Sequence, residues 1–330
     1  MNNVYLASVG TRSGKSILSM GLAVNYPGKV GFYKPFRENL ISRNGDLTDQ
    51  DAVLLADVLK LEEGERLSPF TYDIFEPVSL ADIAAKYGEL SKDKEYMIIE
   101  GSRDLSNGFS RGISNFDIAQ ALGAPIVLVS SPDHRSIDSI FLFRHLCAER
   151  GIELRGVVIN RGAEPKEKEF LEMNGIRVLG EIPEMPELGT FRVKEIADRL
   201  GAKVIAGAAG MDRAVEEVMV GAMDPRDAVR YMQRSRKKAV ITGGDRTDIL
   251  LAALSTDTSC MIVSGGTAPA RAIVSRADEL GIPILLTNED ALTSAETIDR
   301  LIAKIDPKDA KKTALIKAAV KNNVDLDAIW

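Results

Sequence analysis

The sequence predicts an α/β protein with a parallel sheet that carries helices on both faces, followed by a second, smaller α/β domain. In the first half of the chain, short runs that are apolar on both faces alternate with helical stretches, which is typical of a covered parallel sheet. The pattern changes at residues 183–189 (PEMPELG), where prolines and a glycine indicate a linker. A length of 330 residues is also sufficient for two domains.

The elements of the first half can be assigned in order. Helices with an apolar face are expected at 15–24, 117–122 and 136–150, and Gly123 and Gly151 end the last two. Buried strands and shorter strand-like runs are expected at 4–8, 29–33, 95–99, 125–129, 155–159 and 177–179. We expect these elements to form one domain over residues 1–185.

The second half has the same α/β character in fewer elements. A helix is expected at 193–200, and strands are expected at 239–241, 261–263 and 283–286. Two of these strands end in glycine pairs that lead into helices, Gly243-Gly244 and Gly265-Gly266. We therefore expect a second domain over residues 190–303 and a charged helical tail over 304–330.

Composition excludes several classes of function. The chain has a net charge of −6 and no long basic tract, so nucleic acid is not an expected partner. Its two cysteines are far apart and offer neither a disulfide framework nor metal-ligand spacing. No apolar run approaches the ~20 residues that span a bilayer, and the N-terminus is unlike a signal peptide. We expect a cytoplasmic protein without a membrane partner.

The stretch "SVGTRSGKSILSMGLA", residues 8–23, resembles a phosphate-binding loop that runs into a helix. In such loops backbone N–H groups and the helix dipole hold phosphate oxygens, a lysine reaches the outer phosphates, and a Ser or Thr holds Mg²⁺. The usual pattern is G-x-x-x-x-G-K-[ST], but this chain has Val9 at the first position and Gly10 one residue later. A structural turn is the alternative interpretation.

On the nucleotide interpretation, the chain is a P-loop protein with ATP and Mg²⁺ as its cofactors. Lys15 is then a catalytic candidate, and Ser16 is a candidate metal ligand. The residues expected to bind the nucleotide are Gly10, Thr11, Arg12, Ser13, Gly14, Lys15 and Ser16.

Several ordered motifs strengthen this interpretation through a resemblance to a known family. They are "GTRSGKS", "GFYKPFRE", "DQDAVLL", "MIIEGS", "ALGAPIVLV", "GVVINR" and "LGEIP". Over about residues 1–185 the chain resembles the dethiobiotin synthetase family of P-loop enzymes. It resembles even more the dethiobiotin-synthetase-like amino-terminal part of long bacterial phosphotransacetylases, where the first loop glycine is also displaced.

The resemblance implies roles for further residues. Lys34 would face the phosphates or the reacting group, Asp51 and Glu100 would help to hold Mg²⁺, and Asn160 with Pro183 would contact the base. Glu100 follows a buried strand, so it lies at the sheet edge where such folds bind ligands. Three of these roles have an alternative: a surface lysine for Lys34, a helix-start carboxylate for Asp51, and a turn former for Asn160. Asp49 competes with Asp51 for the metal role.

The sequence departs from dethiobiotin synthetase where the substrate would bind. "EGSRDLSNGFSRG" contains Arg103, Asp104 and Arg111 where small residues are expected, and "KPFREN" has larger residues after its proline. Dethiobiotin synthesis is therefore not expected. The two histidines, His134 and His145, lie in or near one helix and do not form a glutaminase site with a cysteine.

The second domain resembles the DRTGG domain over about residues 190–300, although Asp248 stands where the glycine pair of that name would follow. Its glycine-rich loop is a possible anion site, with Arg246 as a charged clamp. A tight structural turn with a helix cap at Asp245 or Thr247 is equally consistent with the sequence. The candidate residues are Gly243, Gly244, Asp245, Arg246 and Thr247.

Two functions follow as hypotheses. The first is an ATP-dependent phosphoryl transfer or ligase-type reaction that activates a small carboxylate or carbamate. The second is a nucleotide sensor in acyl-phosphate or acyl-CoA metabolism with little turnover, acting on a partner enzyme. Since the chain ends at Trp330 without the catalytic domain of the long phosphotransacetylases, that activity is not expected from it alone. A homo-oligomer and an unidentified small-molecule ligand are expected.

Overall fold

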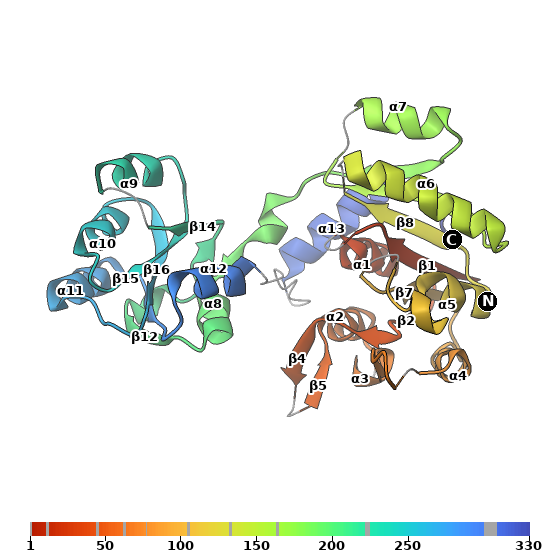
Figure 1. Cartoon of the computed structure of the whole chain (residues 1–330), viewed down its shortest axis with the longest axis horizontal. Coiled ribbons are helices and arrows are strands. Elements are labelled where there is room, and N and C mark those ends of the chain that lie inside the picture. The colour runs from red at the N-terminus through yellow and green to blue at the C-terminus, as the bar shows by residue number, and fades with distance from the viewer. Residues whose placement is uncertain are drawn as a thin grey trace. The chain divides into compact units, whose positions relative to one another are not determined.

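The structure is a computed structural model, and it describes residues 2–10, 13–43, 46–61, 64–76, 78–103, 106–131, 134–162, 165–221, 225–299 and 309–330. The chain forms two compact units (Figure 1). The first unit comprises Met1–Glu184 together with Ile305–Trp330, and the second comprises Met185–Lys304.

The first unit is built on a six-stranded sheet in which all neighbouring strands are parallel, in the order β10-β9-β8-β1-β7-β2. The expected α/β fold is confirmed. The strands are β1 (Asn2–Ser8), β2 (Val30–Tyr33), β7 (Tyr96–Glu100), β8 (Ile126–Ser130), β9 (Leu154–Asn160) and β10 (Val178–Ile182).

Helices cover both faces of this sheet (Figure 1). On β1, Tyr5 and Ala7 join one core, and their buried neighbours Val4 and Leu6 point to the other face because side chains alternate along a strand. One face carries α4 (Leu80–Leu90), α5 (Asn115–Ala121), α6 (His134–Glu149) and α7 (Pro165–Met173). The other carries α1 (Lys15–Asn25), α2 (Gln50–Leu59) and α13 (Ala310–Asn323).

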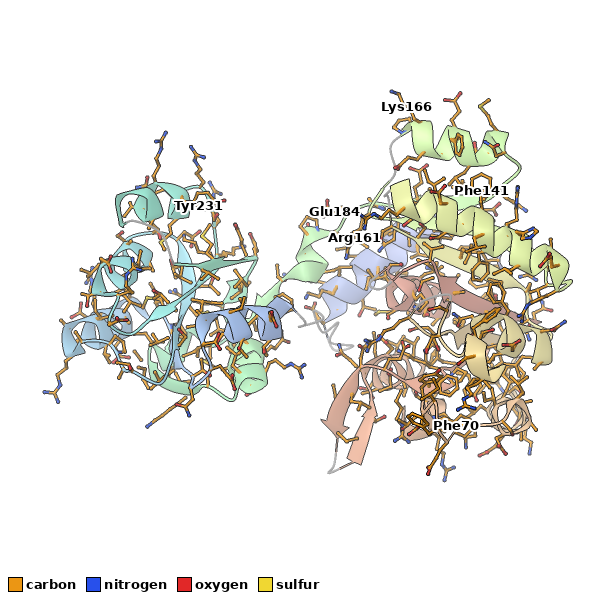
Figure 2. All side chains as sticks on the ribbon, viewed as in Figure 1. Phe70, Phe141, Arg161, Lys166, Glu184 and Tyr231 are labelled. Carbon is orange, nitrogen blue, oxygen red and sulfur yellow. The ribbon has the colours of Figure 1, made fainter. Side chains whose placement is uncertain are left out.

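Local signals explain two helix details. Helix α5 begins two residues before the sequence indicated, because Ser114 and Asp117 form a capping box at its start. Helix α7 packs on α6 through Phe141, which contacts Phe170 edge to face at 5.9 Å (Figure 2).

The segment between β2 and α4 contains small elements that the sequence did not indicate. They are β3 (Phe36–Arg37), β4 (Leu40–Arg43), β5 (Asp46–Asp49), α3 (Gly64–Leu67) and β6 (Phe70–Thr71). Strands β4 and β5 form an antiparallel hairpin in which Leu40 pairs with Asp49. The hairpin therefore returns the start of α2 to the residues that follow Lys34.

The carboxyl-terminal residues complete the first unit. Helix α13 lies along α1 (Figure 1) and is so close that a Cβ atom on Gly21 would meet Val320 at 2.3 Å. After α13, the Asp325 N–H donates to the Leu179 carbonyl at 2.7 Å. The Trp330 ring then packs edge-on against Tyr26 and Tyr96.

The second unit has a five-stranded sheet in the order β12-β17-β16-β15-β14, with β12 antiparallel to β17 and the other pairs parallel. Its strands are β12 (Lys203–Ala206), β14 (Glu217–Val220), β15 (Lys238–Gly243), β16 (Thr258–Ser264) and β17 (Ile284–Leu286). The sequence indicated the three central strands. It missed β12 and β14, which form the two edges and are only partly buried.

Helices cover both faces of the second sheet as well. Helices α9 (Pro225–Met232), α10 (Thr247–Leu254) and α11 (Arg271–Leu280) pack on one face, and α8 (Val193–Leu200) and α12 (Ala291–Asp299) pack on the other. Smaller elements are the two-stranded sheet of β11 (Phe191–Arg192) with β13 (Ala214–Val215), and the short helices η1 (Phe109–Arg111), η2 (Pro186–Gly189) and η3 (Ala208–Gly210). Across the described residues, no helix is both long and apolar enough to cross a bilayer.

Candidate functional site

The expected phosphate loop joins β1 to α1. Gly14 caps the helix in the left-handed conformation, with φ 96°, and the Ser13 hydroxyl donates to the Gly10 carbonyl at 2.7 Å. Thr11 and Arg12 lie outside the described residues. The loop therefore turns at Gly10 and enters the helix at Gly14, which directs the first N–H groups of α1 toward the carboxyl edge of the sheet.

Lys15 lies across this edge. Its ammonium group donates to the Ser8 hydroxyl at 2.7 Å and to the Ser102 carbonyl at 3.2 Å. Burial lowers the pKa of Lys15, although the negative charges of Glu100 and Glu38 oppose that effect. The lysine expected to bind phosphate is thus held between the end of β1 and the segment that follows β7.

Asn160, at the end of β9, supports the loop from another side. Its side-chain amide donates to the Ser13 carbonyl at 3.1 Å, and a Cβ atom on Gly14 would lie 2.0 Å from its Nδ2 atom. This contact and the positive φ require glycine at position 14. Pro183 is exposed directly after β10. Contact of Asn160 and Pro183 with a base stays a prediction.

Lys34 is buried among carboxylates. Its Nζ atom lies 2.5 Å from Asp51, 3.2 Å from Asp49, 3.5 Å from Glu100 and 4.0 Å from Glu38. Burial alone would lower the pKa of Lys34, but the four carboxylates outweigh burial and raise the pKa well above its ordinary value. The alternative of a surface lysine is therefore wrong.

The structure gives the two competing aspartates different surroundings. Asp49 is the N-cap of α2 and accepts the N–H groups of Asp51 and Ala52, and its other oxygen accepts those of Glu38 and Asn39. Asp51 instead turns its side chain to Lys34, Asn39 and Ser16. Burial opposes ionisation of Asp51, yet these partners lower its pKa. The Asp49 carboxylate thus accepts hydrogen bonds from backbone N–H groups, while the Asp51 carboxylate faces the side chains of the site.

Glu100 ends β7 and is almost completely buried. Its Oε2 atom accepts a hydrogen bond from the Ser19 hydroxyl at 2.7 Å. Burial first, and then the negative charge of Asp51, raise the pKa of Glu100 to about 7. Ser19 lies about one helical turn after Lys15 and Ser16, and that spacing is the sequence signal by which it could have been found.

Glu38 is a further member of the cluster that the sequence did not single out. Its side chain is 10% exposed and faces Lys34, and its Oε1 atom accepts the Arg103 N–H at 2.8 Å. The Arg103 guanidinium donates in turn to the Glu38 carbonyl at 2.9 Å. Arg111 is exposed, and Asp104 lies outside the described residues. Glu38 lies in "KPFREN", the stretch that differs from dethiobiotin synthetase, and that difference was the sequence signal by which it could have been found.

The donor set suits a hard cation next to phosphate oxygens. No group of three or more His, Cys, Asp or Glu side chains in the described part of the chain forms a ready metal cluster. Mg²⁺ needs fewer protein ligands than such a cluster provides, because it keeps several waters and is commonly held by one or two carboxylates together with phosphates. Ser16, Asp51 and Glu100 supply a hydroxyl and two carboxylates of this kind, and the ammonium of Lys34 shows that the place between the carboxylates favours positive charge.

The glycine-rich loop of the second unit is closely packed. A Cβ atom on Gly244 would lie 1.9 Å from the Thr267 carbonyl, and Arg246 forms an ion pair with Asp248 at 3.2 Å. Gly243 ends β15, Asp245 follows in the turn, and Thr247 begins α10. The N-cap residue of that helix, Arg246, makes no capping hydrogen bond through its side chain. The close packing requires glycine at position 244, while the anion role of the loop stays a prediction.

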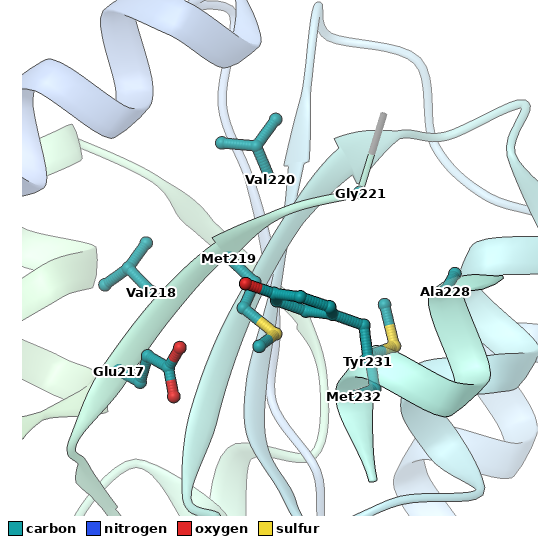
Figure 3. A pocket seen from close by; sticks show the side chains of 8 residues that line it. All are labelled: Glu217, Val218, Met219, Val220, Gly221, Ala228, Tyr231 and Met232. Carbon is teal, nitrogen blue, oxygen red and sulfur yellow. The ribbon is translucent and has the colours of Figure 1, made fainter. Parts of the chain in front are cut away.

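A hollow of about 230 Å³ lies between α9 and the edge strand β14. Figure 3 shows the Tyr231 ring reaching from α9 toward Met219 of β14. The lining residues are Glu217, Val218, Met219, Val220, Gly221, Ala228, Tyr231 and Met232. The sequence did not indicate this pocket, because it is formed by an edge strand and a helix that the sequence analysis did not identify.

Comparison with known families gives two matches. Residues 2–192 match the model of a family described as an AAA domain, and residues 195–301 match the DRTGG domain model. These matches confirm the two resemblances that the motifs indicated.

Curated relatives fall into two groups. The phosphate acetyltransferase of Nitratidesulfovibrio vulgaris is 26% identical over 362 residues, which cover 98% of this chain and 50% of that protein. The ATP-dependent dethiobiotin synthetase of Bacillus velezensis is 29% identical over 172 residues, which cover 48% of this chain and 74% of that protein. This chain thus spans about half the length of the phosphate acetyltransferases that it matches.

Among solved structures, a chain of the MinC:MinD cell division protein complex of Aquifex aeolicus is similar. It is 17% identical, with a TM-score of 0.40, and the match covers 57% of this chain and 84% of that one. At this TM-score the likeness carries no conclusion about function.

Proposed function

This chain belongs to the AAA-domain family, here with a dethiobiotin-synthetase-like P-loop unit joined to a DRTGG domain, and we propose that it binds MgATP at that loop. The residues proposed to hold the nucleotide are Gly10, Thr11, Arg12, Ser13, Gly14, Lys15 and Ser16, with Asn160 and Pro183 toward the base. The observation that carries the proposal is the buried set of Lys34, Asp51 and Glu100 beside Lys15 and Ser16 at the start of α1.

The reaction we propose is transfer of the γ-phosphoryl group to an oxygen acceptor. Ser16, Asp51 and Glu100 would hold Mg²⁺, which when bound neutralises charge on the phosphates. Lys15 and Lys34 would orient the phosphates and stabilise the charge that develops on them. A small carboxylate or carbamate is the acceptor suggested by dethiobiotin synthetase, and water is the simpler alternative.

A second candidate is a sensor that binds nucleotide with little turnover. Arg103 and Arg111, which replace small residues of the synthetases, are both exposed, although Arg103 also donates to the Glu38 carbonyl. Together with the similarity to phosphate acetyltransferases over half of their length, this supports a regulatory role in acyl-phosphate or acyl-CoA metabolism. A partner enzyme belongs to the sensor proposal. A homo-oligomer and a cytoplasmic location belong to both proposals, and nucleic acid and membrane partners belong to neither.

For the second unit, we propose the loop of Gly243, Gly244, Asp245, Arg246 and Thr247 as an anion site. The Arg246 guanidinium now donates to both oxygens of the Asp248 carboxylate, so an anion at this loop would compete with that ion pair. Titration with inorganic phosphate, followed by the chemical shifts of the loop amides, tests this, and an Arg246→Gln variant with unchanged shifts would contradict it.

Lys15→Ala tests the nucleotide proposal. We expect isothermal calorimetry to show loss of MgADP and MgATP binding, and phosphate release to fall to the level of a protein-free control. Lys92→Ala removes an exposed lysine of the same unit and serves as the matched control. Unchanged binding in Lys15→Ala would end the proposal. Binding without turnover in the wild type would favour the sensor.

A further inference from the structure

Glu38 differs from the other carboxylates around Lys34 in how its oxygens are used. Both oxygens of Asp49 accept backbone N–H groups, Asp51 accepts from Lys34, and Glu100 accepts from Ser19. In Glu38, Oε1 accepts the Arg103 N–H, while Oε2 lies 4.0 Å from the Lys34 ammonium. Within the described residues no hydrogen bond reaches Oε2. Glu38 therefore keeps one acceptor oxygen for a group that enters the site.

Contacts with Arg103 hold Glu38 in place. Arg103 holds Glu38 twice, through its N–H on Oε1 and its guanidinium on the Glu38 carbonyl. The Arg103 carbonyl accepts from the Ser8 hydroxyl at 2.8 Å, and that hydroxyl accepts from Lys15. A continuous chain of contacts thus links the lysine of the phosphate loop to Glu38. A base that acts in catalysis needs this kind of fixed geometry.

Electrostatic interactions connect Glu38 to the two lysines proposed to bind the outer phosphates, Lys34 and Lys15. Burial is the first cause of a raised pKa at Glu38, and the lysines and Arg103 reduce the effect without cancelling it. A carboxylate whose pKa is raised accepts a proton more readily near neutral pH.

We propose that Glu38 is the general base of this site, which selects water or another hydroxyl group as the acceptor over the carboxylate or carbamate suggested by dethiobiotin synthetase. The inference rests on the proposed phosphoryl transfer. The acceptor O–H gives its proton to Glu38 Oε2 as its oxygen forms a bond to the γ-phosphorus. The bond from that phosphorus to the β–γ bridging oxygen breaks with its electrons on ADP. Glu38 then releases the proton to solvent.

The acceptor class follows from this step. At neutral pH a carboxylate has no proton to lose, so a base beside it would only repel it. A hydroxyl or water benefits from proton removal as it attacks. Glu38 therefore distinguishes this site chemically from one that phosphorylates a carbamate.

The test compares wild type, Glu38→Gln, Glu38→Asp and Glu89→Gln with MgATP alone, so that water is the acceptor. Glutamine keeps an oxygen for the Arg103 N–H but cannot take a proton, and Glu89 is a surface control paired with Lys86. We expect Glu38→Gln to lower kcat for phosphate release by ~10²- to 10⁴-fold and to lose the acidic limb of the pH–kcat profile. Glu38→Asp should retain that limb at a reduced rate. MgADP binding by calorimetry should stay unchanged in every variant.

Each other result has a defined meaning. A Glu38→Gln variant with wild-type kcat would overturn the inference. A parallel loss of MgADP binding would also overturn it, since Glu38 would then serve binding. Wild type that binds MgADP but releases no phosphate would overturn it and leave nucleotide binding in place. Should Glu38→Gln not fold, Glu38→Asp decides, and loss of its acidic limb would contradict the proposal.

Discussion

The Lys34 ammonium lies 2.5 Å from the Asp51 carboxylate, in a part of the first unit from which water is largely excluded. Three further carboxylates surround the same nitrogen. Attraction between buried charges is strong only while each charge has its partner, and the loss of one partner leaves the others unpaired in a poor solvent for ions. The folding of this unit is therefore tied to the charges of its candidate site.

Lys34→Met tests this dependence. The variant keeps the volume but leaves four carboxylates without their central cation, so we expect the free energy of unfolding to fall by about 3–5 kcal/mol at neutral pH. Urea unfolding measures the loss, with Lys92→Met as an exposed control. Lower pH should recover part of the stability, because protonation removes the repulsion. Equal midpoints for Lys34→Met and wild type would contradict the structure of the cluster.

Glu100 gives the protein a specific dependence on pH. Its pKa is about 7 in the folded chain and 4.5 ordinarily, so between these values the folded state keeps a proton that the unfolded state has released. This contribution to stability is complete below pH 4.5 and is lost as pH rises through 7, by about 3 kcal/mol in total. The lowered pKa of Asp51 acts in another window, since its contribution is lost only as pH falls below about 3.8.

Glu100→Gln isolates the effect. The glutamine variant should lose less stability than wild type between about pH 5 and about pH 8, as measured by urea unfolding at each pH. Mg²⁺-dependent nucleotide affinity should rise with pH over the same range in wild type, because a metal ligand must be ionised. Parallel stability curves for the two proteins would mean that Glu100 is ionised in the folded chain throughout.

The two aspartates of "DQD" should respond in opposite ways. Asp49→Ala removes the acceptor of several backbone N–H groups, so we expect about 2 kcal/mol of destabilisation or more. Asp51→Asn should leave α2 capped and instead lower MgADP affinity by about 10- to 100-fold. Calorimetry and thermal unfolding of both variants make the comparison, and a larger loss of affinity in a folded Asp49→Ala would reverse the assignment.

Two glycines provide a matched test of the packing of α13 on α1. Gly21→Ala should destabilise the protein by about 1–3 kcal/mol, because its new methyl group would meet Val320. Gly88→Ala, in helix α4, meets nothing within 4 Å and should stabilise by about 0.5–1 kcal/mol through helix propensity. Thermal unfolding measures both changes in stability. A Gly21→Ala variant as stable as wild type would show that α1 and α13 are less closely packed than in this structure.

Local pattern was enough to predict the parallel sheet of the first unit. Its strands are apolar on both faces because helices cover both, and this property is visible in a run of five residues such as 125–129. The strands missed in the second unit, β12 and β14, are edge strands with exposed residues, so their sequences lack that signal. The strands within residues 34–49 were harder still to predict from the sequence, because these short strands are defined by pairing and not by periodicity.

The sequence by itself determined which chemistry the first unit can offer. A strand, a glycine turn and Lys15-Ser16 at a helix start are adjacent in the chain, and Glu100 ends a recognisable strand. Only the tertiary structure decided which side chains share that site. The β4–β5 hairpin brings Asp51 to Lys34, and Arg103 orients Glu38. Helix α13 packs along α1 although the whole second unit, Met185–Lys304, lies between them in the sequence. The ionisation and partners of a carboxylate depend on what surrounds it, and those surroundings come from residues distant in sequence.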